Sequence, residues 1–310
     1  MNIDISILIP FLNESENIPF LIDSLIAFCK TNSKKKIEVI FIDDGSKDNS
    51  FELLKSASMN YFEAKIIKLS QNYGSHAALR AGIFHAKGTY ITFMYADLQD
   101  PLELINQLYE EIQKDNKEIV WAVRNEKQNW FSGFYARLMQ RFAVKNFPEN
   151  GFDIVMFSQK IQKQLNQNIE SNSSIFLQIL TLGFKQTTIQ YQKQPRKAGK
   201  SKWTLNKKIK LLVDSFVAFS FFPIRLVSVV GIILFVVGIL FAIYLITRKL
   251  ILDDIKEGWT ALTSILMIGF GITNISLGII AEYLWRTLDA SRKRPIFIID
   301  EIVEINQNKI

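Results

Sequence analysis

The sequence has a single cysteine, Cys29, so it cannot form a disulfide within the chain. This composition suits a reducing compartment. Histidine is almost as scarce, with two residues, which disfavours a metal site built on histidine. The first 17 residues have no basic region, and their short apolar run is interrupted by Asp4, which argues against a signal peptide. We therefore expect the first part of the chain to stay in the cytoplasm.

Acidic residues are outnumbered. There are 30 Asp and Glu residues against 37 Lys and Arg, which gives a formal net charge of +7. A basic chain suits anionic partners such as nucleic acids, nucleotides, phosphates or an anionic membrane surface. With 310 residues, the chain is long enough for one large domain or two modest ones.

Two long segments, residues 226–247 and 259–281, contain no charged side chain. A membrane-spanning helix needs about 20 predominantly apolar residues. The segments therefore predict two transmembrane helices, a hairpin within residues 224–287. The alternative is a pair of buried helices in a soluble core, which is rare for adjacent segments of this length and purity.

Basic residues flank this hairpin toward both chain ends. They are Lys207, Lys208, Lys210 and Arg225 before the first segment, and Arg286, Arg292, Lys293 and Arg294 after the second. Loops rich in Lys and Arg tend to stay in the cytoplasm. We therefore expect a multi-pass protein of the inner (cytoplasmic) membrane, with both termini and a tail over residues 288–310 in the cytoplasm.

Residues 204–223 have an amphipathic pattern just before the first apolar segment. Lysines come early in this stretch, and Leu and Phe side chains follow them. The pattern is typical of a helix that lies in the membrane interface. An ordinary helix of the globular domain remains the alternative.

Residues 1–203 alternate between predicted strands and helices. The strands are near-continuous apolar runs at residues 3–9, 36–43, 64–70, 89–95 and 118–124. One helix is expected after Asn13, which forms a capping-box pattern with Glu16, and another from Pro101. The alternation predicts an α/β fold with a mainly parallel, Rossmann-like sheet covered by helices on both faces. Ligands on such sheets bind beyond the carboxyl ends of the strands.

Polar clusters follow the predicted strands at this edge. They are Asn13-Glu14, Asp43-Asp44-Gly45-Ser46, Ser70-Gln71-Asn72, Asp97-Leu98-Gln99-Asp100 and Arg124. Asp97 and Gln99 offer oxygen ligands to Mg²⁺ or Mn²⁺, metals that use few protein groups plus substrate phosphates. Such a metal can stabilise a departing diphosphate. Plainer explanations stay open, namely helix capping by Asp100 and ordinary turn chemistry at Asp44-Gly45.

Seven stretches, in this order, carry a resemblance to a known family. They are IPFLNESENI (9–18), VIFIDDGSKDNS (39–50), LSQNYGSHAALRAGIFHAKG (69–88), YADLQDPLELI (95–105), GFDIVMFS (151–158), RKAGKSKWTL (196–205) and AEYLWRTL (281–288). The chain resembles family-2 glycosyltransferases with a GT-A fold. Within that family it is similar to the polyprenyl-phosphate branch, which includes dolichol-phosphate mannose synthase and bacterial GtrB-type bactoprenol glucosyltransferases.

The resemblance implies a set of site residues. A nucleotide-sugar donor, most often a UDP-sugar, would be bound by Pro10, Asn13, Glu14, Asp43, Asp44, Ser46, Ala96 and Asp97. A divalent metal, Mg²⁺ or Mn²⁺, would bind at Asp97 and Gln99. The catalytic residues would be Asp97, Arg124 and Asp153. The phosphate of the acceptor, a polyprenyl phosphate, would be bound by Arg124, Ser132, Arg196, Lys200 and Lys202.

The expected reaction is a single inverting displacement that gives a lipid-linked monosaccharide on the cytoplasmic face of the membrane. Membrane lipids are expected partners and nucleic acid is not. Relatives of this kind can form tetramers, so a homo-oligomer is compatible with the resemblance.

The sequence departs from the family pattern at two places, and several alternatives stay open. Tyr95 stands where many relatives have the first acid of an Asp-x-Asp motif, and Lys127 and Gln128 stand where relatives often have an arginine. Asp153 could instead cap a helix, and the basic residues 196–202 could face anionic lipids. A membrane scaffold with a degenerate fold is a rival. A processive polysaccharide synthase is less favoured, because the sequence lacks the Gln-x-x-Arg-Trp motif and further spans.

Overall fold

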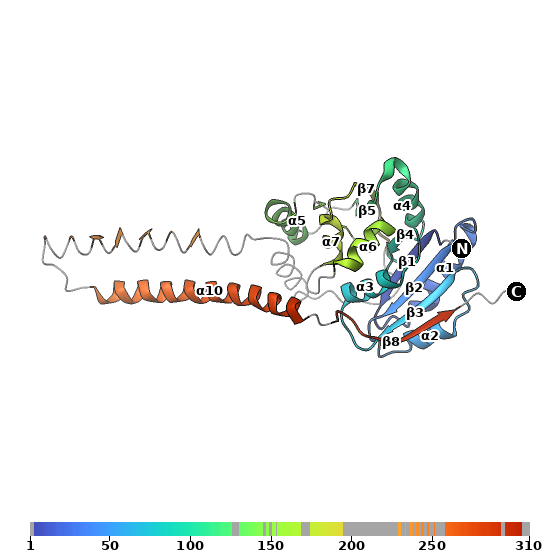
Figure 1. Ribbon diagram of the computed structural model, residues 1–310, viewed down its shortest axis with the longest axis horizontal. Coiled ribbons are helices and arrows are strands. Elements are labelled where there is room, and N and C mark those ends of the chain that lie inside the picture. Colours follow the sequence, from blue (N-terminus) through green and yellow to red (C-terminus); the bar gives the residue numbers. More distant parts are fainter. Residues whose placement is uncertain are drawn as a thin grey trace. The chain divides into compact units, whose positions relative to one another are not determined.

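The computed structural model describes most of the chain before residue 195 and part of it after residue 228. The described residues are 3–125, 130–144, 147–148, 151–152, 154–168, 174–194, 229–230, 233, 236–237, 240–241, 243–244, 247, 251, 258–292 and 295–305. The chain divides into two compact units, one formed by Met1–Leu212 with Pro295–Ile310 and the other by Val213–Arg294. The first unit contains a β-sheet and the second contains a long helix (Figure 1).

An eight-stranded mixed sheet organises the first unit, in the order β7-β5-β6-β4-β1-β2-β3-β8. The strands are β1 (Ile5–Phe11), β2 (Ile37–Asp43), β3 (Glu63–Leu69), β4 (Tyr90–Phe93), β5 (Ile119–Arg124), β6 (Ile154–Ser158), β7 (Gln186–Tyr191) and β8 (Ile299–Ile305). The central strands β4, β1, β2 and β3 are mutually parallel. Strand β6 is antiparallel to both β4 and β5, so β5 and its parallel neighbour β7 point the same way as β4.

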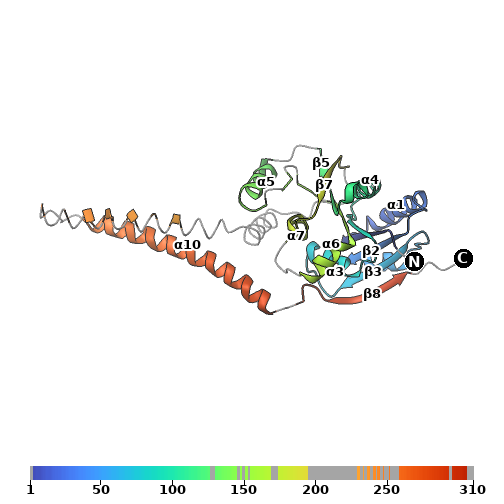
Figure 2. The ribbon, with the colours of Figure 1, turned by 45° about the horizontal axis from the view of Figure 1, so that its top comes forward.

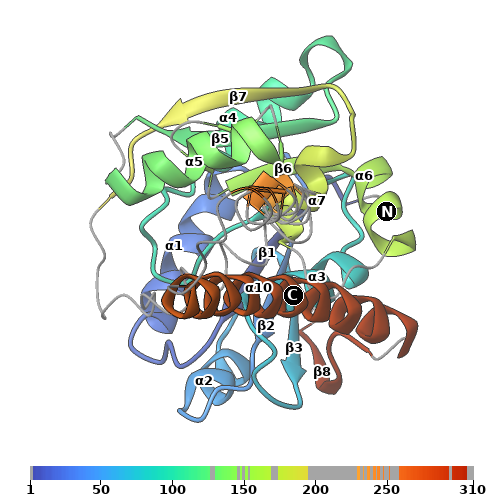
Figure 3. The same cartoon turned by 90° about the vertical axis from the view of Figure 1, so that its left-hand side faces the viewer.

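Helices cover both faces of this sheet. They are α1 (Ile18–Thr31), α2 (Ser50–Ser56), α3 (Ser75–His85), α4 (Leu104–Ile112), the short 3₁₀ helix η1 (Lys114–Asn116), α5 (Trp130–Phe142), α6 (Gln159–Gln167) and α7 (Ile175–Thr181). Helices α1, α2 and α4 share a hydrophobic core with alternate strand residues such as Ile7 and Val39. Helix α3 lies on the opposite face of the sheet from α1 (Figure 3), where its Gly82 is close to the side chains of Leu8 and Ile42. Helices α6 and α7 pack beside α3 (Figure 2).

The central strands read as continuous apolar runs because both of their faces are covered. Every residue of β1 and of β2 is buried, as expected for interior strands of a parallel sheet. Each of the five strands predicted from the sequence overlaps an observed strand. The predicted α/β fold with a mainly parallel sheet is therefore confirmed, and the antiparallel pairs that β6 and β8 form are additions to it.

Two predicted helix starts are wrong. Helix α1 begins at Ile18 after Asn17, and Asn13 lies outside it with φ of 51°. The helix expected from Pro101 begins at Leu104. In both places the chain makes a turn after its strand before the helix begins, and these turns carry candidate site residues.

Strand β8 lies within the predicted C-terminal tail and completes one edge of the sheet. It pairs antiparallel with β3, beside which it is drawn in red in Figure 1. Three ion pairs accompany the strand: Lys55–Glu301 at 2.8 Å, Lys65–Glu304 at 3.2 Å and Lys68–Asp300 at 3.8 Å. Ion pairs at the protein surface contribute little individually, so backbone pairing and the packing of Val303 and Ile305 against the core hold the strand in place.

The second unit contains helix α10 (Trp259–Arg292), whose 34 residues correspond to a length of about 50 Å at the α-helical rise. The helix continues past residue 281, where the second apolar segment was predicted to end. Its exposed large apolar side chains include Leu262, Ile265, Leu266, Phe270, Ile275, Leu277, Ile280, Leu284, Trp285 and Leu288. Within the described residues, no helix meets the length and hydropathy expected of a membrane span. The predicted interface helix, residues 204–223, lies outside the described residues.

Cys29 on α1 is expected to be unreactive in the native protein. Its side chain is buried, and burial raises the pKa of the thiol to about 12. Because the thiolate is the reactive species, a maleimide reagent at pH 8 should leave native protein unlabelled and should label it once denaturant opens the first unit. Mass spectrometry measures the labelled fraction. Rapid labelling of native protein would contradict the buried environment.

Candidate active site

The carboxyl ends of neighbouring strands bring the predicted site residues to one edge of the sheet. Strands β4, β1 and β2 are adjacent and parallel. The turns that follow them carry Asp97, Asn13 and Asp44, respectively. Arg124 ends β5, which points the same way. This is the edge at which sheets of this kind bind ligands.

The loops after β1 and β2 are tied together by reciprocal hydrogen bonds. The Asn13 amide donates to the Ser46 hydroxyl at 2.9 Å, and the Lys47 amide donates to the Asn13 side-chain oxygen at 2.8 Å. Asn13 adopts a left-handed conformation with φ of 51°, which asparagine tolerates better than most residues. These contacts explain why Asn13 serves the loop rather than the start of α1.

A second set of hydrogen bonds also joins the loops after β1 and β2. It includes two residues that the sequence analysis did not single out, Asp48 and Ser50. The Glu14 amide donates to the Ser50 hydroxyl at 2.9 Å, and the Ser15 amide donates to Asp48 at 3.1 Å. Burial alone would raise the pKa of Asp48, but hydrogen bonds from Ser50 and Ser15 outweigh it and lower that pKa. The sequence does contain a pattern that could have indicated these two residues: Asp48-Asn49-Ser50 is the Asp-x-Ser pattern of a turn in which the Asp side chain binds the backbone two residues on.

Asp43 is fully buried at the end of β2. Its Oδ1 atom accepts a hydrogen bond from the Ser46 amide at 2.8 Å. Its Oδ2 atom is buried and has no hydrogen-bond partner among the described residues. Burial raises the pKa of this carboxyl above its ordinary value, although hydrogen bonds from Ser46 oppose the shift. A buried acceptor without a partner has the character of a binding group, because an unmet hydrogen bond there is costly.

Asp44 has a different position from its neighbour. Its carboxylate accepts hydrogen bonds from the backbone amide of Tyr73 at 2.8 Å and from that of Gly74 at 3.0 and 3.1 Å. The carboxylate therefore holds the loop after β3. Gly45, with φ of +74°, lets the two loops touch, since a Cβ atom there would be 2.6 Å from the carbonyl carbon of Gln71. Asp44 thus fixes the loop after β3 at the carboxyl ends of the strands.

The turn after β4 carries the candidate metal ligands. Asp97 is partly exposed, and its Oδ1 atom accepts a hydrogen bond from the Gln99 amide at 3.3 Å. Among the described residues, no group of three or more His, Cys, Asp or Glu side chains is arranged to hold a metal. One oriented carboxylate and an amide oxygen nevertheless fit a hard cation that arrives with substrate phosphates. The described residues are therefore compatible with such a metal at Asp97 and Gln99.

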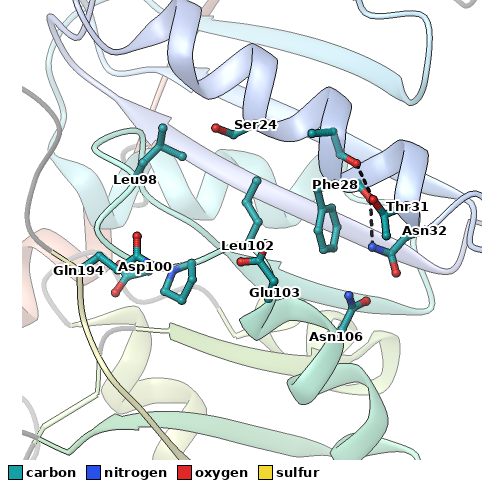
Figure 4. A pocket seen from close by; sticks show the side chains of 12 residues that line it. Ser24, Phe28, Thr31, Asn32, Leu98, Asp100, Leu102, Glu103, Asn106 and Gln194 are labelled. Atoms are coloured by element: carbon teal, nitrogen blue, oxygen red, sulfur yellow. Dashed lines mark hydrogen bonds between the residues drawn. The ribbon is translucent and has the colours of Figure 1, made fainter.

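Asp100 does not cap helix α4, whose N-cap position is Glu103. Instead, its buried carboxylate accepts a hydrogen bond from the Tyr191 hydroxyl at 2.7 Å and lies 3.7 Å from the Lys193 ammonium. The sequence did not indicate this contact, because Tyr191 ends β7, a strand that was not predicted, and Lys193 follows that strand. A cavity of about 400 Å³ lies beside this contact, between α1 and the segment from Leu98 to Asn106 (Figure 4).

The remaining predicted residues fall into three groups. Pro10 lies in buried β1 opposite Ile42, and Ala96 is buried at the start of the turn after β4. Ser132 lies on α5, and its side chain is outside the described part. Four further predicted residues are outside the described residues altogether: Asp153, Arg196, Lys200 and Lys202. Their predicted roles in catalysis or in binding the acceptor phosphate stay predictions.

The strand order and the acidic loops after β2 and β4 fit a GT-A-like domain. The sequence profile described as "Glycosyl transferase family 2" matches residues 6–176. The chain belongs to glycosyl transferase family 2. The family assignment and the glycosyltransferase activity predicted from the sequence are therefore confirmed.

Similarity to curated proteins extends over the whole chain. The chain is 32% identical to the "Uncharacterized glycosyltransferase YkcC" of Bacillus subtilis, over the whole of this chain and 97% of the relative. It is 31% identical to the undecaprenyl-phosphate 4-deoxy-4-formamido-L-arabinose transferase of Edwardsiella ictaluri, over 98% of this chain and 95% of the relative. The similarity thus reaches well beyond the region that the family profile covers.

A solved structure supports the fold independently of close sequence similarity. The glucosyl-3-phosphoglycerate synthase of Mycobacterium tuberculosis, in complex with Mn²⁺, UDP and phosphoglyceric acid, aligns with a TM-score of 0.50 and 14% identity. The alignment covers 69% of this chain and 76% of the synthase. At this identity the likeness establishes a shared fold.

Proposed function

We propose that this enzyme transfers a sugar from a UDP-sugar to polyprenyl phosphate, undecaprenyl phosphate in bacteria, on the cytoplasmic face of a membrane. The observation that carries the proposal is the full-length similarity to relatives named undecaprenyl-phosphate sugar transferases, which spans 98% of this chain. That similarity includes the apolar and basic segments that follow the catalytic domain. Such segments would bring an enzyme whose acceptor is a lipid phosphate to the membrane that holds this acceptor.

We assign the nucleotide of the donor from the side chains at the carboxyl ends of the parallel strands. We assign the base to Asp43, whose buried Oδ2 atom has no hydrogen-bond partner among the described residues and would accept the ring N–H that uracil offers at N3. We assign the rest of the nucleoside to Asn13, Glu14 and Ser46, which lie where the loops after β1 and β2 are joined by hydrogen bonds. Asp44 supports this pocket through the loop after β3.

The diphosphate of the donor is placed at Asp97 and Gln99 with Mg²⁺ or Mn²⁺. When bound, the metal supplies positive charge that stabilises the departing nucleoside diphosphate. Asp97 would hold the metal with its one carboxylate, since Tyr95 stands where many relatives have a first acid and offers no carboxylate. The backbone amide of Gln99 donates a hydrogen bond to the Asp97 carboxylate.

The reaction is a single inverting displacement. An oxygen of the lipid phosphate forms a bond to the anomeric carbon while the bond from that carbon to the diphosphate breaks, and the bonding electrons leave with the diphosphate. A phosphate monoester is largely dianionic at pH 7, since its second pKa is about 6, so it needs little help from a base. Arg124 brings positive charge to the two anionic substrates, and we assign acceptor contacts to Ser132, Arg196, Lys200 and Lys202. Asp153 is assigned to the acceptor side.

Membrane attachment is proposed through the two apolar segments, with the interface helix before them and both termini in the cytoplasm. The uncharged runs at residues 226–247 and 259–281 and the basic flanks support this arrangement. The large apolar side chains exposed along α10 also support it, because a soluble surface rarely carries so many. Contact with membrane lipids follows, and a homo-oligomer is compatible with it.

The test is an activity panel with the purified full-length protein in detergent. Undecaprenyl phosphate is combined with UDP-glucose, UDP-galactose, UDP-GlcNAc, UDP-GalNAc, UDP-4-deoxy-4-formamido-L-arabinose or GDP-mannose, with Mg²⁺, Mn²⁺ or EDTA. We expect mass spectrometry to detect a glycosyl-phospholipid with one UDP-sugar, and EDTA to abolish it. Transfer that survives EDTA would reject the metal assignment alone. Failure of every donor, with the protein shown to be folded by protection of Cys29, would count against the proposed reaction.

A further inference from the structure

The turn that carries Asp97 contains a strained residue. Leu98 has φ of 53° and a buried side chain. The left-handed region is strongly disfavoured for residues other than glycine, asparagine and aspartate. Such a conformation persists only where the surrounding structure holds it. Within the turn, the Leu98 amide makes a long 3.4 Å hydrogen bond to the Tyr95 carbonyl, and the Gln99 amide donates to Asp97 at 3.3 Å.

Shorter contacts reach the turn from the far end of β7. The Tyr191 hydroxyl donates to Asp100 at 2.7 Å, and the Gln194 amide donates to the Gln99 carbonyl at 2.8 Å. The Lys193 ammonium lies 3.7 Å from Asp100. Figure 4 shows Asp100 and Gln194 next to each other at one end of the cavity. Residues 99 and 100, immediately after the strained Leu98, are thus held by the segment 191–194.

We propose that Tyr191 and Lys193 are positioning residues for Asp97, and that they act through Asp100. This inference rests on the proposed donor site, because it concerns the carboxylate assigned to the metal and diphosphate. By holding residues 99 and 100, the segment 191–194 fixes the direction in which the turn presents Asp97. The same segment ends two residues before Arg196 in the sequence. The part of the chain that leads into the basic residues 196–202 therefore also positions the turn after β4 that carries Asp97.

The experiment measures Mn²⁺ binding by the full-length protein in the presence of UDP, from the loss of the electron paramagnetic resonance signal of free Mn²⁺. Tyr191→Phe keeps the buried ring and removes only the hydroxyl, and Lys193→Met keeps the length of the side chain without its charge. We expect each to weaken Mn²⁺ binding by about tenfold, the lower end of the effect of losing a residue that orients a metal ligand. Tyr109→Phe on α4 is the matched control, since its ring packs on Tyr90, and it should bind Mn²⁺ like wild type.

Asp97→Asn provides the reference that separates the two proposals. If Asp97→Asn abolishes Mn²⁺ binding while Tyr191→Phe and Lys193→Met bind like wild type, the positioning role is overturned and the donor site stands. If Asp97→Asn binds like wild type, the metal assignment falls and the positioning role falls with it. Equal weakening by Tyr109→Phe would also reject the inference, because it would show a general loss of stability. Should Tyr191→Phe fail to fold, Lys193→Met decides the question.

Discussion

Exchange of Asp97 for asparagine is expected to lower kcat for sugar transfer at least about a hundredfold. Charge stabilisation by a bound metal is worth several kcal/mol, and about 1.4 kcal/mol corresponds to a factor of ten in rate. Asparagine keeps the size of the side chain and an oxygen that can still accept the Gln99 amide hydrogen. The substitution therefore removes the negative charge and leaves the local backbone contact in place.

Initial rates measured with saturating Mn²⁺ and the donor identified by the panel decide this prediction. Asp23→Asn is a matched control, because Asp23 is exposed on α1 and is not one of the candidate site residues. It should retain the wild-type rate. A rate for Asp97→Asn within about threefold of wild type corresponds to a change of under ~1 kcal/mol in the activation free energy. Such a rate would show that the enzyme needs neither an acid at position 95, where it has Tyr95, nor the carboxylate of Asp97. The metal would then have to be placed elsewhere.

The part of the fold that the sequence predicted well is the part with the strongest local pattern. β1 and β2 lie between two layers of helices, so their residues are apolar almost without interruption. β7 and β8 lie at the two edges of the sheet and mix polar with apolar residues. Their sequences therefore resemble loops or tails, and only pairing with β5 and β3, far away in the chain, gives them a strand conformation.

The candidate site shows the same division. Acids after strands, such as Asp43 and Asp97, were found because the carboxyl edge of a parallel sheet is a known place for ligands. The sequence could not separate the two acids of the β2 loop, since the difference arises from partners. Asp44 is bound by the backbone of Tyr73 and Gly74, whereas one oxygen of Asp43 faces no described partner. Helix capping stayed open for Asp100 because its partner Tyr191 on β7 is about ninety residues away in the chain.

Gly45→Ala is expected to be among the most destabilising single-methyl changes in the first unit. The added Cβ atom would lie 2.6 Å from the carbonyl carbon of Gln71 and 2.7 Å from the amide nitrogen of Asn72. Both are backbone atoms, so the clash cannot be relieved by rotating a side chain. The left-handed backbone costs about 1–2 kcal/mol and overpacking typically costs about 1–3 kcal/mol, so we expect a loss of about 2–5 kcal/mol in the free energy of unfolding.

Gly183→Ala isolates the steric part of this cost. Gly183 has φ of +75°, nearly the same as +74° at Gly45, but a Cβ atom there meets nothing within 4 Å. Its substitution should cost only the backbone contribution of about 1–2 kcal/mol. The denaturant concentration at which Cys29 becomes reactive measures both variants in the full-length protein. Equal midpoints would mean that the loops after β2 and β3 are not in contact at Gly45. A lower midpoint for Gly45→Ala, together with weaker UDP binding, would show that this contact both stabilises the sheet edge and shapes the donor pocket.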